Sequence, residues 1–336
     1  SDAYLIAVPT PFDDSLKPDV KYIKSAAQAI APVLKPGDLV VLESTSPVGT
    51  TEKLESWLSN ERPDLNFADS KEQNIFVAHC PERVLPGKVI KELVSNDRII
   101  GGTTEAASAL AKSLYELFVE GRCIITNART AEMAKLTENA FRDVNIAFAN
   151  ELSLICEDLD INVWQLIELA NHHPRVNILS PGPGVGGHCI AVDPWFIVDS
   201  SPNNAKLIKT ARVINDDKPD WVINKVVKEA STIEKAKIAC FGLAFKPDID
   251  DLRESPALKI VVELATKIDG DILAVEPHIS ELPKVLAKSN VSLVSANDAL
   301  ERADICVILV DHTLFKSIDK EKFKNKKVID TKGLIL

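Results

Sequence analysis

The sequence predicts an α/β protein in which two open parallel-sheet domains are joined by a long central helical region. Short apolar runs alternate with helical segments over residues 3–126, and the same alternation returns from residue 237. Between them, residues 130–159 contain no glycine or proline and repeat apolar residues at helical spacing. Apolar strands separated by helices are typical of a parallel sheet covered on both faces. The uninterrupted middle segment predicts one long helix.

We delimit an N-terminal domain at residues 1–128. Its apolar runs, which we expect to be strands, are 3–8, 39–42, 75–78, 98–101 and 123–125. The segments between them with helical composition and period are 20–34, 50–58 and 104–118.

The central domain, residues 129–230, begins with the long helix and continues with helical segments at 163–170 and 204–229. The C-terminal domain, residues 231–336, is a second open α/β unit. Its expected strands are 237–241, 271–275, 291–294, 305–310 and 327–329, and its expected helices are 255–267, 281–288 and 296–301.

Composition narrows the class of function. The net charge of −10 and pI of about 5.2 argue against nucleic acid as a partner, because neutralising phosphates needs a basic surface. The cysteines do not have the regular spacing that is typical of disulfide-bonded proteins, and no apolar segment is long enough to span a membrane. We therefore expect a cytoplasmic protein in a reducing compartment, with neither nucleic acid nor membrane as partner.

Residues 180–196 form the most informative segment, because four glycines and three prolines surround Cys189 there. Such a segment cannot be a regular helix or central strand. A thiol on a rigid loop with amide donors nearby is typical of a nucleophile. The alternative is a buried apolar cysteine.

Two other readings of this loop are set aside. Gly182, Gly184 and Gly187 match G-x-G-x-x-G, but prolines flank them and residues 189–195 do not resemble the start of a helix. His172, His173 and His188 near Cys189 suggest zinc or thiol-redox chemistry. They lack a second matching ligand pair, so we expect no metal.

Several segments, in order, resemble the UDP-glucose/GDP-mannose dehydrogenase family along essentially the whole chain. They are Val8-Pro9-Thr10-Pro11, the Glu43–Thr50 segment, Cys80-Pro81-Glu82-Arg83, the Lys135–Phe141 segment, Gly186-Gly187-His188-Cys189, the Phe241–Asp248 segment and the Leu252–Pro256 segment. With His188 before the cysteine, the chain is most similar to the UDP-N-acetylhexosamine branch.

The resemblance implies two Rossmann-like domains, the first binding NAD and the C-terminal one binding the UDP-sugar. It implies oxidation of a sugar C6 alcohol to a carboxylate by two NAD⁺, with Cys189 forming a thiohemiacetal and then a thioester. N-acetylmannosamine and N-acetylglucosamine remain alternative sugars. Among the catalytic residues that it implies besides Cys189, Lys135 and Asn139 lie one helical turn apart and would face one oxyanion. The others are Glu82, Asp193 and Thr45.

The resemblance also assigns the binding residues. Substrate would contact Glu82, Lys135, Asn139, Arg175, Gly186, His188, Phe245 and Lys246, and NAD would contact Val8, Pro9, Thr45 and Arg253. Arg175 matches a residue that crosses a dimer interface, which implies a homodimer or higher homo-oligomer. Taken singly, several of these residues have ordinary explanations. Lys135 and Asn139 could form a solvated helix face, Glu82 and Asp193 could belong to turns, and Thr45 could cap a helix.

The chain departs from the family pattern in two places. Pro86 stands where a second glutamate is common, and no glycine-rich turn precedes Ala3. We therefore expect an N-terminal part to be missing, and this chain to bind UDP-sugar but hold NAD⁺ weakly. A UDP-sugar-binding protein without turnover is the alternative function.

Overall fold

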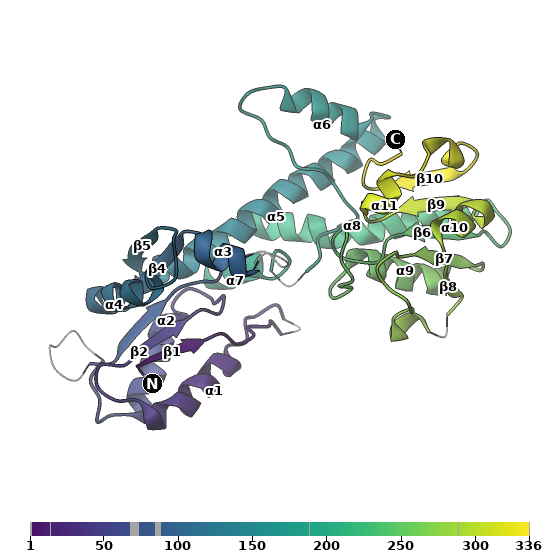
Figure 1. The fold of residues 1–336 in the computed structure, drawn as a ribbon. Helices are drawn as coiled ribbons and strands as arrows, with labels where there is room; N and C mark the ends of the chain where they lie inside the picture. The colour runs from purple at the N-terminus through teal and green to yellow at the C-terminus, as the bar shows by residue number, and fades with distance from the viewer. Residues whose placement is uncertain are drawn as a thin grey trace. The chain divides into compact units, whose positions relative to one another are not determined.

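The computed structural model describes residues 2–13, 15–67, 74–84, 89–187, 189–287 and 289–335. The chain forms two compact units. Residues 1–141 and 192–209 make the first, and residues 142–191 and 210–336 make the second. Each contains an open sheet with helices packed on it (Figure 1). This confirms the predicted α/β class with two Rossmann-like domains. The division into three domains stays a prediction.

The first unit is built on a five-stranded sheet of order β1-β2-β3-β4-β5. The strands are β1 (Ala3–Ile6), β2 (Leu39–Leu42), β3 (Phe76–His79), β4 (Arg98–Gly102) and β5 (Cys123–Asn127). Neighbouring strands run parallel except β3 and β4, which pair antiparallel at Ala78 and Gly102. The apolar runs predicted these strands, but their direction depends on pairing partners that a run does not encode.

Helices cover both faces of this sheet. They are α1 (Lys21–Ile30), α2 (Thr50–Glu61), α3 (Val89–Ser95) and α4 (Glu105–Tyr115), and a 3₁₀ turn follows α1 at Ala31–Val33. Val40 and Leu42 pack among α1 and α2, whereas Leu39 and Val41 pack against α4. Alternate residues of β2 thus face opposite layers, which is why the whole strand is apolar.

The long helix predicted at 130–159 is α5 (Ala128–Asp158). It is followed by α6 (Val163–Asn171), α7 (Asp193–Ser200) and α8 (Lys206–Ala230). The expectation that 189–195 contains no helix start was wrong, because α7 begins at Asp193 with Pro194 in its first turn. Proline is well tolerated there, since the amide it lacks would have no partner inside the helix.

The second unit contains a parallel sheet of order β10-β9-β6-β7-β8. Its strands are β6 (Ile238–Phe241), β7 (Ile272–Val275), β8 (Val291–Leu293), β9 (Ile305–Ile308) and β10 (Lys327–Asp330). One face packs against α8 and α9 (Pro256–Lys267), and the other against α10 (Ala296–Arg302) and α11 (Thr313–Lys316). These layers can be followed in Figure 1.

The helix predicted at 281–288 was wrong in extent. Only a 3₁₀ turn forms, at Lys284–Leu286, because Pro283 disfavours the helical conformation for Leu282 before it. Lys288 lies outside the described residues. A further 3₁₀ turn lies at Lys320–Phe323. Within the residues described, no helix has both the length and the apolar character that a membrane crossing requires.

Candidate functional site

The glycine-rich loop before Cys189 is anchored at its first glycine. Gly182 donates its amide to Asn150 Oδ1 over 2.8 Å, and Asn150 Nδ2 donates to Asn215 Oδ1 over 2.8 Å. Both asparagines are buried, one on α5 and one on α8. The loop therefore leaves a rigid helix pair, and it presents Cys189 as an exposed residue. This excludes a buried thiol, and the role of Cys189 as a nucleophile stays a prediction.

The same loop packs directly on the segment after β6. A Cβ added to Gly186 would lie 2.5 Å from the Glu254 carbonyl oxygen and 3.1 Å from Phe245 Cβ. Gly187 has φ +83° and donates its amide to Glu254 over 3.3 Å. Glycine is needed here because no side chain fits between the two backbones. The fold thus brings the predicted substrate residues Gly186 and Phe245 together.

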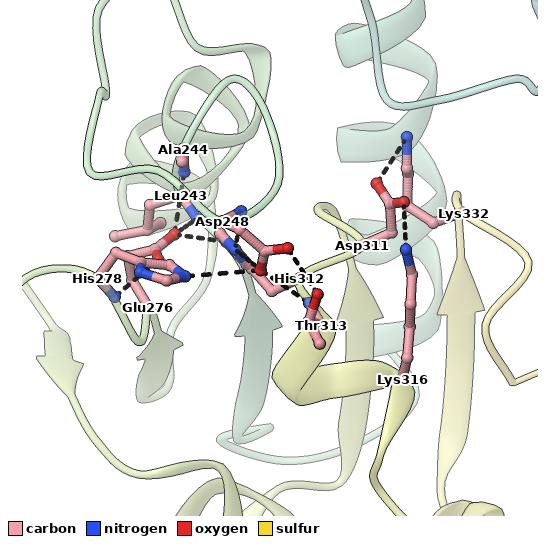
Figure 2. A network of polar contacts seen from close by, with 10 residues as sticks. All are labelled: Leu243, Ala244, Asp248, Glu276, His278, Asp311, His312, Thr313, Lys316 and Lys332. Atoms are coloured by element: carbon pink, nitrogen blue, oxygen red, sulfur yellow. Dashed lines mark hydrogen bonds and ion pairs between the residues drawn. The ribbon is translucent and has the colours of Figure 1, made fainter. Parts of the chain in front are cut away.

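A buried polar network shapes the loop that carries Phe245 and Lys246 (Figure 2). Glu276 directly follows β7, and its Oε2 accepts the amides of Leu243 over 2.8 Å and Ala244 over 3.1 Å. His312, after β9, hydrogen-bonds the same Oε2 over 3.1 Å. Three loops at the carboxyl ends of neighbouring strands are thereby tied together. In open α/β sheets this is the edge where ligands bind.

Asp248 completes this network and determines the tautomer of His312. The Asp248 amide donates to His312 Nδ1 over 2.9 Å, so His312 is neutral with its proton on Nε2, which donates to Glu276. The Asp248 carboxylate accepts bonds from the amide and hydroxyl of Thr313. Asp248 itself has φ +59°, a conformation that side chains seldom adopt.

Asp248, His278 and His312 place potential metal-ligating atoms within 4.8 Å of one another. Both ring nitrogens of His312 are already used in hydrogen bonds, so this residue could ligate a metal only by giving up one of them. The cluster is better explained as a structural network. His172 and His173 belong to no such cluster within the described ranges.

The predicted cations of the substrate site are exposed. Neither Lys246 nor Arg175 forms an ion pair with a carboxylate in the part of the chain that the structure describes, so both can receive a diphosphate. Arg253, expected to contact NAD, is instead paired with Asp251 two residues earlier through a contact of 2.6 Å. Its assignment stays a prediction.

The first unit brings three other predicted residues together. Asn139, on α5, donates from Nδ2 to Asp193 Oδ2 over 2.5 Å, and both residues are buried. Burial raises the pKa of Asp193 to about 6, against the opposing effects of the Asn139 hydrogen bond and the positive charge of Lys135. Asp193 therefore holds the amide of Asn139 in place beside Lys135.

Glu82 has a partner that sequence reasoning missed. Its Oε2 accepts from Arg98 Nη1 over 3.0 Å, and its Oε1 accepts the amide of Arg83 over 2.6 Å. Arg98 opens β4 and is 1% exposed. An arginine at the edge of an apolar strand run was the available signal, since a buried guanidinium needs an anion. Arg83 in turn pairs with Glu138 of α5.

Three of the residues expected to contact NAD, Val8, Pro9 and Thr45, follow the carboxyl ends of β1 and β2. Val8 donates its amide to Ser44 Oγ over 2.7 Å, and the Thr10 hydroxyl donates to the Thr45 carbonyl over 2.6 Å. These bonds hold the two loops side by side, with Pro9 exposed and Thr45 half-buried. Ligands of open α/β sheets bind at this edge, and the contact of these residues with NAD stays a prediction.

Cys189 belongs to the second unit, whereas Thr45, Glu82, Lys135, Asn139 and Asp193 belong to the first. Their assembly into one catalytic site stays a prediction. His188 and Pro86 lie outside the described residues.

Known proteins resemble this chain along its length. Residues 1–119, 129–217 and 239–335 match, respectively, the NAD binding, central and UDP binding domains of the UDP-glucose/GDP-mannose dehydrogenase family. An NDP-N-acetyl-D-galactosaminuronic acid dehydrogenase from Ralstonia nicotianae is 62% identical over 99% of this chain and 79% of its own length.

Two further relatives carry another name. A UDP-N-acetyl-D-mannosamine dehydrogenase from Campylobacter jejuni is 61% identical over 96% of this chain and 80% of its own. The solved structure of a UDP-D-ManNAc dehydrogenase from Pyrococcus horikoshii is similar with a TM-score of 0.87 and 41% identity. That match covers 100% of this chain and 78% of the other.

Proposed function

Because the chain belongs to the UDP-glucose/GDP-mannose dehydrogenase family of NAD-dependent UDP-sugar dehydrogenases, we propose that UDP-N-acetyl-D-mannosamine is its substrate. The product is UDP-N-acetyl-D-mannosaminuronate. The observation that carries the proposal is the exposed Cys189 at the end of a glycine loop packed against Phe245. A thiol and a cationic binding loop are thereby linked through one rigid contact.

The chemistry requires four electrons to leave C6 as two hydrides. NAD⁺ accepts each hydride when bound. After the alcohol becomes an aldehyde, the Cys189 thiolate adds to its carbonyl carbon and gives a thiohemiacetal. Loss of the second hydride gives a thioester, and water then releases the carboxylate and restores the thiol. The covalent bond keeps the aldehyde from escaping between the two oxidations.

Lys135 and Asn139 stabilise the oxyanion that forms at C6, since an ammonium and an amide N–H both favour negative charge there. The 2.5 Å bond to Asp193 supports this role, because it orients the Asn139 amide. Thr45 positions the attacking water and the nicotinamide. Glu82 activates that water, and its pairing with Arg98 keeps the carboxylate oriented.

Lys246 and Arg175 bind the diphosphate, with Arg175 supplied by a second copy of the chain. Phe148 and Ile155 of α5, with Leu159 directly after the helix, support self-association, since they leave 46–62% of their surface exposed. Exposed apolar side chains gathered on one element are typical of an interface. The proposal includes a homo-oligomer in the cytoplasm.

The test is a panel assay with UDP-N-acetyl derivatives of mannosamine, glucosamine and galactosamine. We expect the highest kcat/KM with the mannosamine compound and two NADH for each sugar oxidised. Preference for the glucosamine compound would support the first alternative, and preference for galactosamine would match the name of the Ralstonia relative. If calorimetry detects UDP-sugar binding but no NADH forms with any of the sugars, the chain is a UDP-sugar-binding protein without turnover.

A second arm tests the thiol. Cys189→Ser should abolish formation of the acid while the fold survives, because a hydroxyl is less acidic and its ester hydrolyses less readily. Cys123→Ser, at a half-buried cysteine of β5, is the matched control and should retain turnover. Full carboxylate production by Cys189→Ser would refute the covalent route.

A further inference from the structure

A cavity of about 140 Å³ lies within the second unit, away from the Phe245 loop. Its walls come from α5, the start of α6, α8 and the end of β10, and they include Cys156, Trp164, Gly182, Lys218 and Trp221. None of the roles proposed above uses this cavity. Its lining combines two indole rings with two lysines, Lys218 and Lys225, and two carboxylates, Glu157 and Asp330.

Lys218 is the decisive residue of this cavity. It is 3% exposed and donates to Ser153 Oγ, whose own proton goes to the Asn150 carbonyl. Its Nζ lies 4.2 Å from the centroid of the Trp221 ring. Within the described residues no carboxylate pairs with it. A buried ammonium without an anion is costly, and proteins ordinarily pair such a group.

The other charged groups of the cavity compensate Lys218 only in part: Glu157 favours its charged form, but burial and the charge of Lys225 outweigh that effect. Lys225, 5.2 Å from the same indole centroid, pairs with Glu157 over 2.7 Å. Asp330 accepts the amides of Lys332, Gly333 and Ile335, so its carboxylate closes the chain turn after β10. Burial, aided by repulsion from Lys225, lowers the pKa of Lys218 to about 7. An anion that enters the cavity from solvent would neutralise the charge of the Lys218 ammonium.

The remaining surface of the cavity suits an apolar group. Trp164 is held by the backbone of Gly333, where an added Cβ would lie 2.5 Å from the indole. Trp221 forms another wall, and Lys218 covers its ring. A cavity of this size accommodates a benzene-sized molecule. Polar donors at one end and aromatic walls elsewhere are the usual composition of small-molecule sites.

We propose that this cavity binds a small organic carboxylate of about the size of benzoate, with the carboxylate on Lys218 Nζ and the apolar body against Trp164 and Trp221. The ligand replaces the missing counter-ion of Lys218. Pro181 and Gly182 also line the cavity, so the ligand contacts the first residues of the loop that leads to Cys189. Binding itself does not depend on the reaction proposed above.

The experiment titrates the whole protein with sodium benzoate at constant ionic strength, followed by calorimetry. Benzyl alcohol serves as the uncharged probe of the same shape. Lys218→Met removes the charge but keeps the length of the side chain, and Lys228→Met removes an exposed lysine from the same helix. NMR of the lysine Cε carbons reports the pKa of the Lys218 amine with and without benzoate.

We expect one benzoate to bind per chain. Its affinity should fall at least about tenfold in Lys218→Met and stay unchanged in Lys228→Met, because a charge-assisted hydrogen bond is lost only in the first. Benzoate should raise the pKa of Lys218, and benzyl alcohol should bind more weakly. Equal affinity for both probes, or benzoate binding that survives Lys218→Met, would overturn the proposal, as would no binding to the wild-type protein. If Lys218→Met does not fold, the pKa of Lys218 in the wild-type protein is the test. A pKa that benzoate does not change would then overturn the proposal.

Discussion

Nε2 of His312 donates a hydrogen bond to Oε2 of Glu276 over 3.1 Å, and both side chains are fully buried. The two residues are 36 positions apart and lie in the loops that follow β7 and β9 of the second sheet. Through Leu243, Ala244 and Asp248 the pair also fixes the loop that presents Phe245 and Lys246. The geometry of the expected UDP-sugar loop thus depends on a pair that does not itself reach the ligand.

His312→Ala should lower the free energy of unfolding by about 1–3 kcal/mol, because it removes the side-chain hydrogen bond to a buried carboxylate. The KM for UDP-sugar should rise more than kcat falls, since the loop loosens while the reacting groups remain. Urea unfolding and steady-state kinetics measure the two effects. His278→Ala, at the partly exposed neighbour, is the control and should change stability by less than about 1 kcal/mol. Equal effects of the two substitutions would contradict this role.

Gly186→Ala should disrupt the contact between the cysteine loop and the Phe245 loop. The new methyl group would lie 2.5 Å from the Glu254 carbonyl oxygen and 2.6 Å from Pro256 Cδ, so one backbone must move. We expect a loss of about 1–3 kcal/mol in stability together with weaker UDP-sugar binding. Gly182→Ala is the matched control, since its nearest neighbour is 3.7 Å away. Calorimetric titration with UDP-sugar that fails to separate the two variants would show that the contact is dispensable.

Asp193 should make stability depend on pH in a defined direction. Burial raises its pKa from 3.8 to about 6, so between these values the folded protein binds more protons than the unfolded chain. Stability must therefore fall as the pH rises through this window, because the folded state has to bury the charge.

Asp193→Asn removes that loss. The free energy of unfolding of the variant minus that of the wild type should rise by about 3 kcal/mol from roughly pH 4 to pH 7. This value follows from a pKa shift of about two units. Urea unfolding across this range measures it. Asp199→Asn, at an exposed residue of the same helix, is the matched control. A flat difference for Asp193→Asn would mean that the carboxylate keeps its ordinary pKa.

Lys135→Ala should reduce turnover by a factor of roughly 10² or more, because it removes a cation from the developing oxyanion. Lys24→Ala, at an exposed residue of α1, should leave turnover unchanged. Steady-state NADH formation under saturating substrate distinguishes the two. If the Lys135→Ala variant keeps its activity, Lys135 is an ordinary solvated residue of the helix surface and has no catalytic role.

Glu82→Gln should slow the hydrolysis of the thioester and let a covalent adduct on Cys189 accumulate, visible by intact mass. Arg98→Met should have the same effect more weakly, since it leaves Glu82 in place but removes the contact that orients it. If neither variant accumulates an adduct, Glu82 has no part in hydrolysis.

The sequence by itself determined the class of the fold and most of its elements. Helical spacing over 130–159 and apolar runs such as Leu39–Leu42 are local properties, so periodicity alone could place α5 and β2. The glycines around Cys189 were equally informative, because the backbone freedom of glycine is a property of the residue itself and does not depend on its neighbours. The limits of local patterns appear at Asp193, where a proline after a turn residue concealed the start of α7.

Tertiary structure alone decided which side chains meet. Asn139 and Asp193 are 54 positions apart, Arg98 and Glu82 are 16 apart, and neither pair follows from any spacing in the chain. The antiparallel pairing of β3 with β4 and the burial of Lys218 were likewise decided only by packing. The physical reason is that a local pattern is the spacing of apolar and polar residues along one segment, and it carries no information on which other segment packs against it. Contacts between distant polar groups depend instead on how the segments close into layers. There Lys218 is buried against Ser153 and Trp221, and no carboxylate of the described residues pairs with it.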